Sequence, residues 1–323
     1  MPEATSQTRT RSPRRGLTRS LILFAFIAFF GMYMLRGIPG EVARWKMAAA
    51  EDLFFAERFD PAFAMAADAQ RWDRDNVFFG TEQARWNRQT DNLSAALESL
   101  NATLETANGD KDATAELLIQ RADLLQAMDK HTEALADVEK VFELLKLARS
   151  PSDENKRYVP QRVNTRAYFI ARARAAQQAS DKQLGEALED MRELMRYWDV
   201  NLNSTRLHDV SPIGKMQFRV TELGYLDTYA YLRLLNREVG PALHDFNRCI
   251  AMCDHLMALA VSLSSDTRYS AEMQSFLYIL RDHKAVILYH RGQTHELLQN
   301  DAAAIADFQA AKLLGFNKKL GRW

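Results

Sequence analysis

Arginine and aspartate recur at a fixed spacing along this chain, and they are its clearest candidates for chemistry. Three pairs are separated by sixteen residues, namely Arg121 with Asp137, Arg174 with Asp190, and Arg291 with Asp307. Repeated carboxylates could act as general acids or bases, but their recurrence from repeat to repeat indicates a structural role instead. We expect each arginine to meet its aspartate across two paired helices, and the Tyr229 hydroxyl to point toward Asp245 in a fourth pair.

Cysteine and histidine form no recognisable metal or catalytic pattern. Cys249 and Cys253 lie four residues apart, so on a helix they share one face. Two thiols without further ligands make a poor metal site, and we interpret both as core residues. His283, His290 and His295 have no cysteine or carboxylate at ligand spacing, which favours packing or solvated side chains.

Catalytic motifs are also missing from the sequence. It contains no nucleophile elbow, phosphate loop, dinucleotide fingerprint or zinc-protease motif. The sequence therefore predicts a protein that is not an enzyme, with no cofactor and no metal. An enzyme whose site is not visible in motifs remains an alternative.

Small residues mark the helices that would position these side chains. Each repeat has an alanine or glycine on a first helix and an alanine twelve residues later on a second, followed by further residues at offsets of four and seven. These offsets lie on one helical stripe, so they predict the packing face of a helical hairpin. The predicted packing residues are Ala122, Ala134, Ala175, Ala187, Ala230, Ala242, Phe246, Gly292, Ala304, Phe308 and Ala311.

This pattern resembles the tetratricopeptide repeat, most closely at Gly292, Ala304, Phe308 and Ala311. The resemblance implies an all-α fold of stacked helical hairpins. The spacing is irregular, because the key alanines at 62, 134, 187, 242 and 304 are further apart than the roughly 34 residues of the family. Residues 91–104 are expected to add a helix that belongs to no repeat.

The composition agrees with an all-α fold and argues against nucleic acid as a partner. Only 13 Gly and 8 Pro occur in 323 residues, and no long alternating pattern predicts a strand. The formal charge is zero overall. Residues 1–20 contain five arginines and one acidic residue, so the rest of the chain has a slightly negative net charge. It therefore offers no basic face for the phosphates of a nucleic acid.

An uncharged apolar run from Ser20 to Leu35 predicts a membrane-spanning helix over residues 17–36. Residues 1–16 would form a basic cytoplasmic tail, and the following domain would be extracytoplasmic, or periplasmic in a Gram-negative bacterium. Ile38-Pro39-Gly40 is expected to break the helix. A cleaved secretory signal is the competing interpretation.

The predicted domains after this anchor are a degenerate first repeat with an extra helix in residues 41–110 and a repeat domain in residues 111–323. Resemblance to the tetratricopeptide family implies that other proteins bind, as peptide segments or helices, along the inner helices. In this frame the groove residues are Arg172, Asp227, Tyr231, Tyr289 and Gln293.

The sequence thus favours a membrane-tethered, non-catalytic scaffold or adaptor for protein–protein interaction. One alternative is a structural subunit of an envelope or secretion complex. Another is an exported soluble repeat protein, if the N-terminal segment is cleaved. Self-association through the last apolar face is a further hypothesis.

Overall fold

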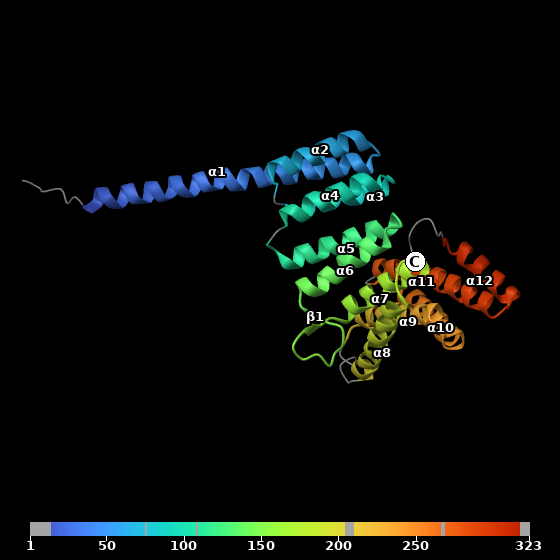
Figure 1. The fold of residues 1–323 in the computed structure, drawn as a ribbon. Coiled ribbons are helices and arrows are strands. Elements are labelled where there is room, and N and C mark those ends of the chain that lie inside the picture. Colours follow the sequence, from blue (N-terminus) through green and yellow to red (C-terminus); the bar gives the residue numbers. More distant parts are fainter. Residues whose placement is uncertain (1–13, 75, 108, 204–209, 266–268, 317–323) are drawn as a thin grey trace, which may run out of the picture. The chain divides into compact units, whose positions relative to one another are not determined.

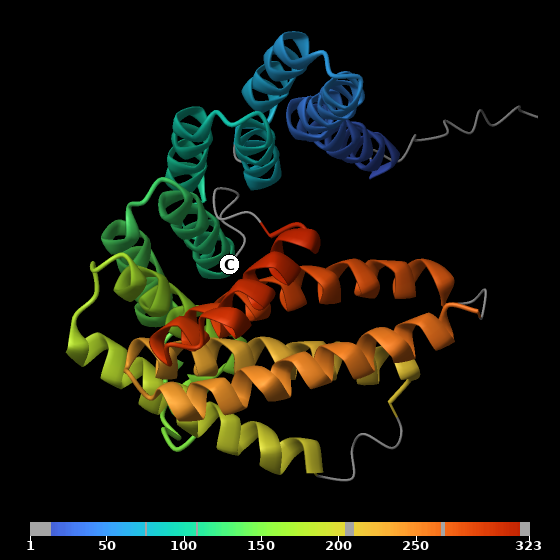
Figure 2. The same cartoon turned by 90° about the vertical axis from the view of Figure 1, so that its right-hand side faces the viewer.

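The computed structural model describes residues 14–74, 76–107, 109–203, 210–265 and 269–316. These residues form twelve α-helices and one pair of two-residue strands, which confirms the all-α prediction. Consecutive helices pair as antiparallel hairpins (Figures 1 and 2). The chain divides after Ala107 into two compact units, which are described separately below.

The first unit contains two hairpins. Helix α1 (Arg14–Phe55) pairs with α2 (Phe59–Trp72), and α3 (Val77–Gln89) pairs with α4 (Leu93–Thr106). Fully buried alanines bring the first pair together, namely Ala43, Ala50, Ala62, Ala66 and Ala69. Phe54 of α1 stacks on Trp86 of α3 with ring centroids 4.9 Å apart, which joins the two hairpins into one core.

The helix does not break at Ile38-Pro39-Gly40, so that prediction is wrong. Helix α1 runs through Pro39 to Phe55 (Figure 1). A proline inside a helix costs about 3 kcal/mol, because it removes a hydrogen bond and crowds the preceding turn. The packing of Met47 and Phe54 against α2 holds the downstream half helical and offsets this cost. Residues 1–13, and the side chains of most of the predicted span 17–36, lie outside the described residues.

The second unit contains four hairpins. They are α5 (Lys111–Ala127) with α6 (His131–Leu144), α7 (Pro160–Ala175) with α8 (Asp181–Asn203), α9 (Pro212–Leu235) with α10 (Val239–Leu263), and α11 (Ser270–Leu297) with α12 (Asp301–Leu313). Strands β1 (Leu147–Ala148) and β2 (Arg157–Tyr158) pair in parallel and close the loop between α6 and α7. Helices longer than four turns account for much of the irregular repeat spacing.

Among the residues with described side chains, α10 alone is long and apolar enough to cross a membrane by its length and composition. Its apolar stripe is occupied by protein, because Phe246, Cys249 and Cys253 are fully buried in the hairpin stack. Helix α10 packs against the long helices α9 and α11, which lie beside it in Figure 2. We therefore interpret α10 as a helix of the second unit that packs through one face and leaves the other exposed.

Every hairpin turn contains one residue in the left-handed backbone conformation, and none of these residues is glycine. The residue after it donates its amide to a carbonyl five residues earlier, as Lys130 does to Leu125 and Asn300 does to His295. This pair of features is the Schellman arrangement that ends a helix. The six left-handed residues are Glu57, Asp91, Asp129, Gln177, Arg237 and Gln299, with φ between 57° and 65°.

The small residues of the repeats lie where the hairpin helices meet. Ala122, Ala134, Ala187, Ala230, Ala242 and Ala311 are fully buried, as is Phe246, while Ala304 is 2% exposed. A Cβ on Gly292 would lie 2.6 Å from the Phe308 ring, so glycine is required for this close approach. Phe308 itself is half-buried.

Ala175 is the exception, because it is exposed at the last turn of α7, and the packing role predicted for it is wrong. Ala167, which is 1% exposed, takes that position eight residues earlier. Three alanines of α7 follow an arginine, namely Ala167, Ala173 and Ala175, and the first of these arginines, Arg166, pairs with Asp190. The α7–α8 hairpin uses the earliest one, because its turn between Ala175 and Asp181 is longer than the turns of the other hairpins.

Two of the three predicted Arg–Asp ion pairs form across their hairpins. Arg121 binds Asp137 through two hydrogen bonds of 2.7 and 2.6 Å, and Arg291 binds Asp307 through two of the same lengths, which confirms both predictions.

The other two pairs differ from the prediction. Arg174 pairs with Asp181 instead of Asp190, so that prediction is wrong. Tyr229 meets Asp245 only through Arg233, which donates to the Tyr229 hydroxyl at 2.9 Å and to the Asp245 carboxylate at 2.5 Å.

Residues 91–104 do not form an unmatched helix, and that prediction is also wrong. Residues 93–104 belong to α4, which pairs with α3 through Ala84 and Ala96 at the usual spacing of twelve residues. Gly80 allows the close approach, since a Cβ there would lie 1.8 Å from the Thr103 hydroxyl. With Ala96 included, the first two gaps between key alanines are 34 and 38 residues, close to the family period.

Replacing Ala304 by leucine should lower the free energy of unfolding by about 1 to 3 kcal/mol, because the larger side chain overpacks the α11–α12 interface. Ala306 lies on the exposed side of the same helix, so Ala306→Leu is the matched control and should change stability by less than about 0.5 kcal/mol. Urea unfolding of the full chain measures both. Equal stability of the two variants would contradict the assigned packing frame.

Candidate functional site

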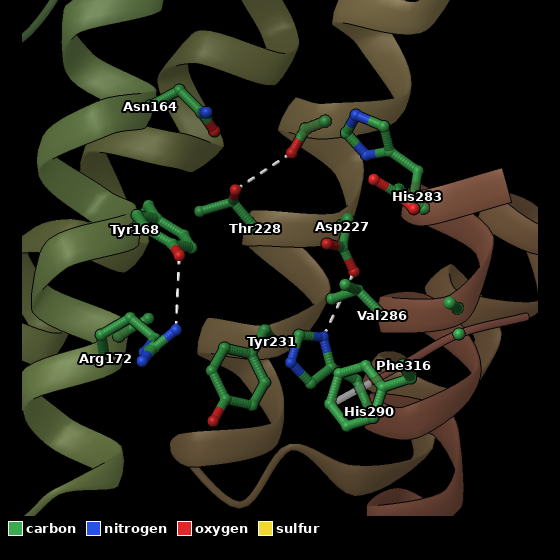
Figure 3. A pocket seen from close by; sticks show the side chains of 15 residues that line it. Asn164, Tyr168, Arg172, Asp227, Thr228, Tyr231, His283, Val286, His290 and Phe316 are labelled. Carbon is green, nitrogen blue, oxygen red and sulfur yellow. Dashed lines mark hydrogen bonds and ion pairs between the residues drawn. The ribbon is translucent and has the colours of Figure 1, made fainter. Parts of the chain in front are cut away.

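A cavity of about 330 Å³ opens among the first helices of three successive hairpins in the second unit (Figure 3). Helix α7 contributes Asn164, Tyr168, Ala171 and Arg172; helix α9 contributes Gly224, Asp227, Thr228 and Tyr231; helix α11 contributes Asp282, His283, Ala285, Val286 and His290; and Gly315 and Phe316 follow α12. Its volume is at the lower end of the range for small-molecule sites.

Helical periodicity explains why these residues share the cavity. On each helix the lining residues recur at intervals of three or four, as in Asn164, Tyr168 and Ala171 or Gly224, Asp227 and Tyr231. Such residues occupy one stripe of a helix. The three inner helices therefore each present one stripe to the same space.

The cavity brings together three of the five predicted groove residues, namely Arg172, Asp227 and Tyr231. Tyr289 does not line it but stacks on Phe316, which does, with ring centroids 4.4 Å apart. Gln293 lies further along α11 and outside the lining, and its side-chain oxygen is buried without a hydrogen-bond partner.

A buried polar pair forms one wall of the cavity. His290 is 3% exposed, its Nδ1 lies 3.5 Å from an Asp227 carboxylate oxygen, and its ring stacks on Tyr231 at a centroid distance of 4.0 Å. The other ring nitrogen, Nε2, is buried without a partner. Burial raises the pKa of Tyr231 well above its ordinary value, so its hydroxyl stays protonated at physiological pH.

Arg172 stands on the opposite wall. It donates from Nη1 to the Tyr168 hydroxyl at 3.4 Å, one turn earlier on α7, and Figure 3 shows both residues facing Asp227 and His290 across the space. Thr228 is tied to its own helix, since its hydroxyl donates to the Gly224 carbonyl at 3.0 Å. The cavity thus combines charged groups of both signs with aromatic walls.

Sequence reasoning missed several lining residues, of which Tyr168, His290 and Phe316 are the most informative. Tyr168 lies four residues before Arg172, so extending the predicted groove stripe by one turn would have included it. Phe316 follows the last helix and reaches the cavity only through the fold. No sequence pattern signals that contact.

Cys249 and Cys253 are fully buried in α10, which confirms their interpretation as core residues. Burial raises the pKa of both thiols, that of Cys253 to about 12, so neither thiol ionises readily. Among the residues that the structure describes, no three His, Cys, Asp or Glu side chains lie together as a metal site.

A second charged cluster lies apart from the cavity, around Arg166 of α7. This guanidinium is 2% exposed and contacts Glu139 at 2.7 Å, Asp190 at 2.7 Å and Glu186 at 3.4 Å. Arg149 also contacts Glu139 and Glu186, at 3.0 and 3.3 Å. Three carboxylates thus share two arginines. The cluster ties α6, α7 and α8 together and is structural.

Stability should depend on pH through this cluster. Burial raises the pKa of Asp190 to about 6, against the opposing effect of Arg166. A folded-state pKa above the ordinary value means that the folded protein binds the proton more tightly, so the free energy of unfolding should fall as pH rises from about 4 to about 6. Asp190→Asn should flatten this slope in urea titrations, whereas the exposed Asp199→Asn should retain it. Parallel slopes in both variants would contradict the assignment.

No protein-family model and no curated protein matches the chain. Among solved structures it is similar to a tetratricopeptide repeat protein from Parabacteroides merdae, with 15% identity, coverage of 87% of this chain and 96% of that one, and a TM-score of 0.47. It is also similar to PilW, a type IV pilus biogenesis factor, with 15% identity, coverage of 86% of this chain and 96% of that one, and a TM-score of 0.47. The tetratricopeptide repeat domain of P58(IPK) has 16% identity, coverage of 87% of this chain and 95% of that one, and a TM-score of 0.29. Identities and TM-scores this low assign neither a family nor a partner to the chain.

Proposed function

We propose that the second unit is a non-catalytic scaffold that binds peptide segments of other proteins in the cavity among α7, α9 and α11. The observation that carries this proposal is the convergence of Arg172, Asp227 and Tyr231, from two successive hairpins, on one cavity. Three successive hairpins present their first helices, α7, α9 and α11, to this space, so an extended peptide can contact several repeats at once.

The mixed character of the lining supports a peptide over a purely apolar ligand. Tyr168, Tyr231 and Phe316 offer ring surfaces for side chains, while Arg172 and Asp227 can bind backbone carbonyl and amide groups. A volume of about 330 Å³ accommodates one large side chain with part of its backbone. The remainder of the peptide would lie across the open mouth.

Peptide selection tests the proposal. The full chain, purified in detergent and immobilised, is screened against a random peptide library, and selected peptides are measured by calorimetry. Arg172→Ala and Asp227→Asn should each weaken binding about tenfold or more, since each removes a charge-assisted hydrogen bond. Arg174→Ala is the matched control, because Arg174 lies two residues away on α7 and pairs with Asp181 outside the cavity. Peptides that bind all four proteins equally would refute the cavity as the binding site.

We also propose that residues 17–36 tether this scaffold to a membrane, with residues 1–16 cytoplasmic and the chain from about residue 41 onward extracytoplasmic. The uncharged run from Ser20 to Leu35 and the arginines before it support this topology. The α1 backbone is helical through the run. Extraction of the chain from membranes by alkaline carbonate would contradict the tether, and mass spectrometry of the mature chain distinguishes an anchor from a cleaved signal.

A further inference from the structure

We infer that the cavity among α7, α9 and α11 takes a cationic side chain, lysine or arginine, from the bound peptide. This inference rests on the proposed peptide-binding function and specifies the side chain that the cavity accepts. The charges of the lining provide the first argument. Asp227 and Asp282 carry negative charge and Arg172 carries positive charge, so the ionised lining has a net negative charge.

Unsatisfied acceptors provide the second argument. The buried Nε2 of His290 has no partner, and it is an acceptor in the tautomer that donates from Nδ1 to Asp227. The Asn164 side-chain oxygen is likewise buried without one. Buried polar atoms are nearly always hydrogen-bonded in folded proteins, so the site lacks donors. A guanidinium or ammonium group consists of donors only and would meet this need.

Aromatic rings provide the third argument. Tyr231 and His290 stack on one another, and Phe316 is held by its stacking on Tyr289. Tyr168 faces this group from α7 (Figure 3). Cations bind favourably over the faces of aromatic rings, more so when the site excludes water. The apolar stem of a lysine or arginine would pack on the same rings.

Arg172 and Asp227 lie on opposite walls, so they can bind different parts of the ligand. Figure 3 shows Arg172 on the α7 wall and Asp227 across the cavity beside His290. A cationic side chain at Asp227 would leave Arg172 to bind a peptide carbonyl. The lining thus has one site for the side chain and one for the peptide backbone. An anionic side chain at Arg172 is the opposite orientation, and the experiment below separates the two.

Three pentapeptides test the inference by titration calorimetry on the full chain in detergent. They have the form acetyl-Ala-Ala-X-Ala-Ala-amide, with X as arginine, its neutral isostere citrulline, or glutamate. The arginine peptide should bind about tenfold more tightly than the citrulline peptide, because charge-assisted hydrogen bonds are the stronger kind. Asp227→Asn should abolish this difference, and Asp199→Asn, on the exposed surface of α8, should preserve it.

Arg172→Gln tests the two orientations. Glutamine keeps a donor for the peptide carbonyl but loses the charge-assisted hydrogen bond, so the arginine and citrulline peptides should both bind more weakly by a similar factor and the preference for arginine should persist. Loss of that preference in Arg172→Gln, or preference of the native chain for the glutamate peptide, would overturn the inference in favour of an anionic anchor. Circular dichroism melts establish that each variant is folded.

The failure of this inference is distinguishable from the failure of the proposed function. If library-selected peptides bind through Arg172 and Asp227 while none of the three pentapeptides binds, or citrulline equals arginine, the cationic anchor is wrong and the peptide-binding site stands. If Arg172→Ala and Asp227→Asn leave the affinity of the selected peptides unchanged, the cavity is not the binding site and both proposals are wrong.

Discussion

Replacing Arg166 by alanine should lower the free energy of unfolding of the second unit by about 3 to 5 kcal/mol, since removing one partner of a buried ion cluster leaves uncompensated charge behind. Arg166 is 2% exposed and contacts Glu139, Glu186 and Asp190, which come from two different helices. Without the guanidinium, Asp190 would lose its ion pair, while Glu139 and Glu186 would keep Arg149. The carboxylates at the interface of α6, α7 and α8 should therefore repel one another and weaken the packing of these helices.

Urea unfolding of the full chain, with hydrogen exchange to locate the loosened helices, measures this effect. Arg162→Ala is the matched control one turn earlier on α7, because Arg162 forms a single, more exposed pair with Glu116. We expect that variant to cost about 1 kcal/mol or less. Adding Asp190→Asn to Arg166→Ala should recover part of the loss. A loss below about 1 kcal/mol for Arg166→Ala would show that the cluster tolerates the missing charge.

Replacing Trp86 by alanine should destabilise the first unit by about 3 to 5 kcal/mol. Trp86 is fully buried, stacks on Phe54 at 4.9 Å, and meets the edge of Phe63 at 6.3 Å. The substitution removes the largest side chain at the junction of the two hairpins of this unit and leaves a cavity there. Partial collapse of neighbouring helices sets where in this range the cost falls.

Trp72→Ala is the control for this prediction, because Trp72 is 47% exposed on α2 of the same unit. It should cost less than about 1 kcal/mol. Thermal unfolding followed by hydrogen exchange of peptides from residues 76–107 separates the first unit from the second. Similar protection of these peptides in both variants would mean that Trp86 does not hold the hairpins together.

The hairpins themselves could be predicted to a large extent. Offsets of four and seven residues define one face of a helix whatever the surroundings, so Ala134, Ala242 and Ala304 were placed at helix interfaces from spacing alone. The pair Ala84 and Ala96 obeys the same rule, so the spacing also predicts the α3–α4 hairpin.

The α7–α8 hairpin could not be resolved in this way. Arg166-Ala167 and Arg174-Ala175 both precede Ala187, and the spacing of twelve residues selected the second. The fold uses the first, because helix lengths and the turn set which residues lie opposite one another. A local pattern cannot decide this when three Arg-Ala dipeptides occur in one helix.

The sequence by itself determined the helical class, the packing stripes and two of the three sixteen-residue ion pairs, since these depend on helix periodicity within one hairpin. The resemblance to a known repeat implied that Arg172 and Asp227 share a groove, but only the tertiary structure brings His290 and Phe316 to them, because these residues come from elements separated by long stretches of chain. The same is true of the partners of Arg166, which come from different hairpins. Contacts of this kind depend on how hairpins stack, and the stacking is set by the summed packing of many side chains that no single spacing records.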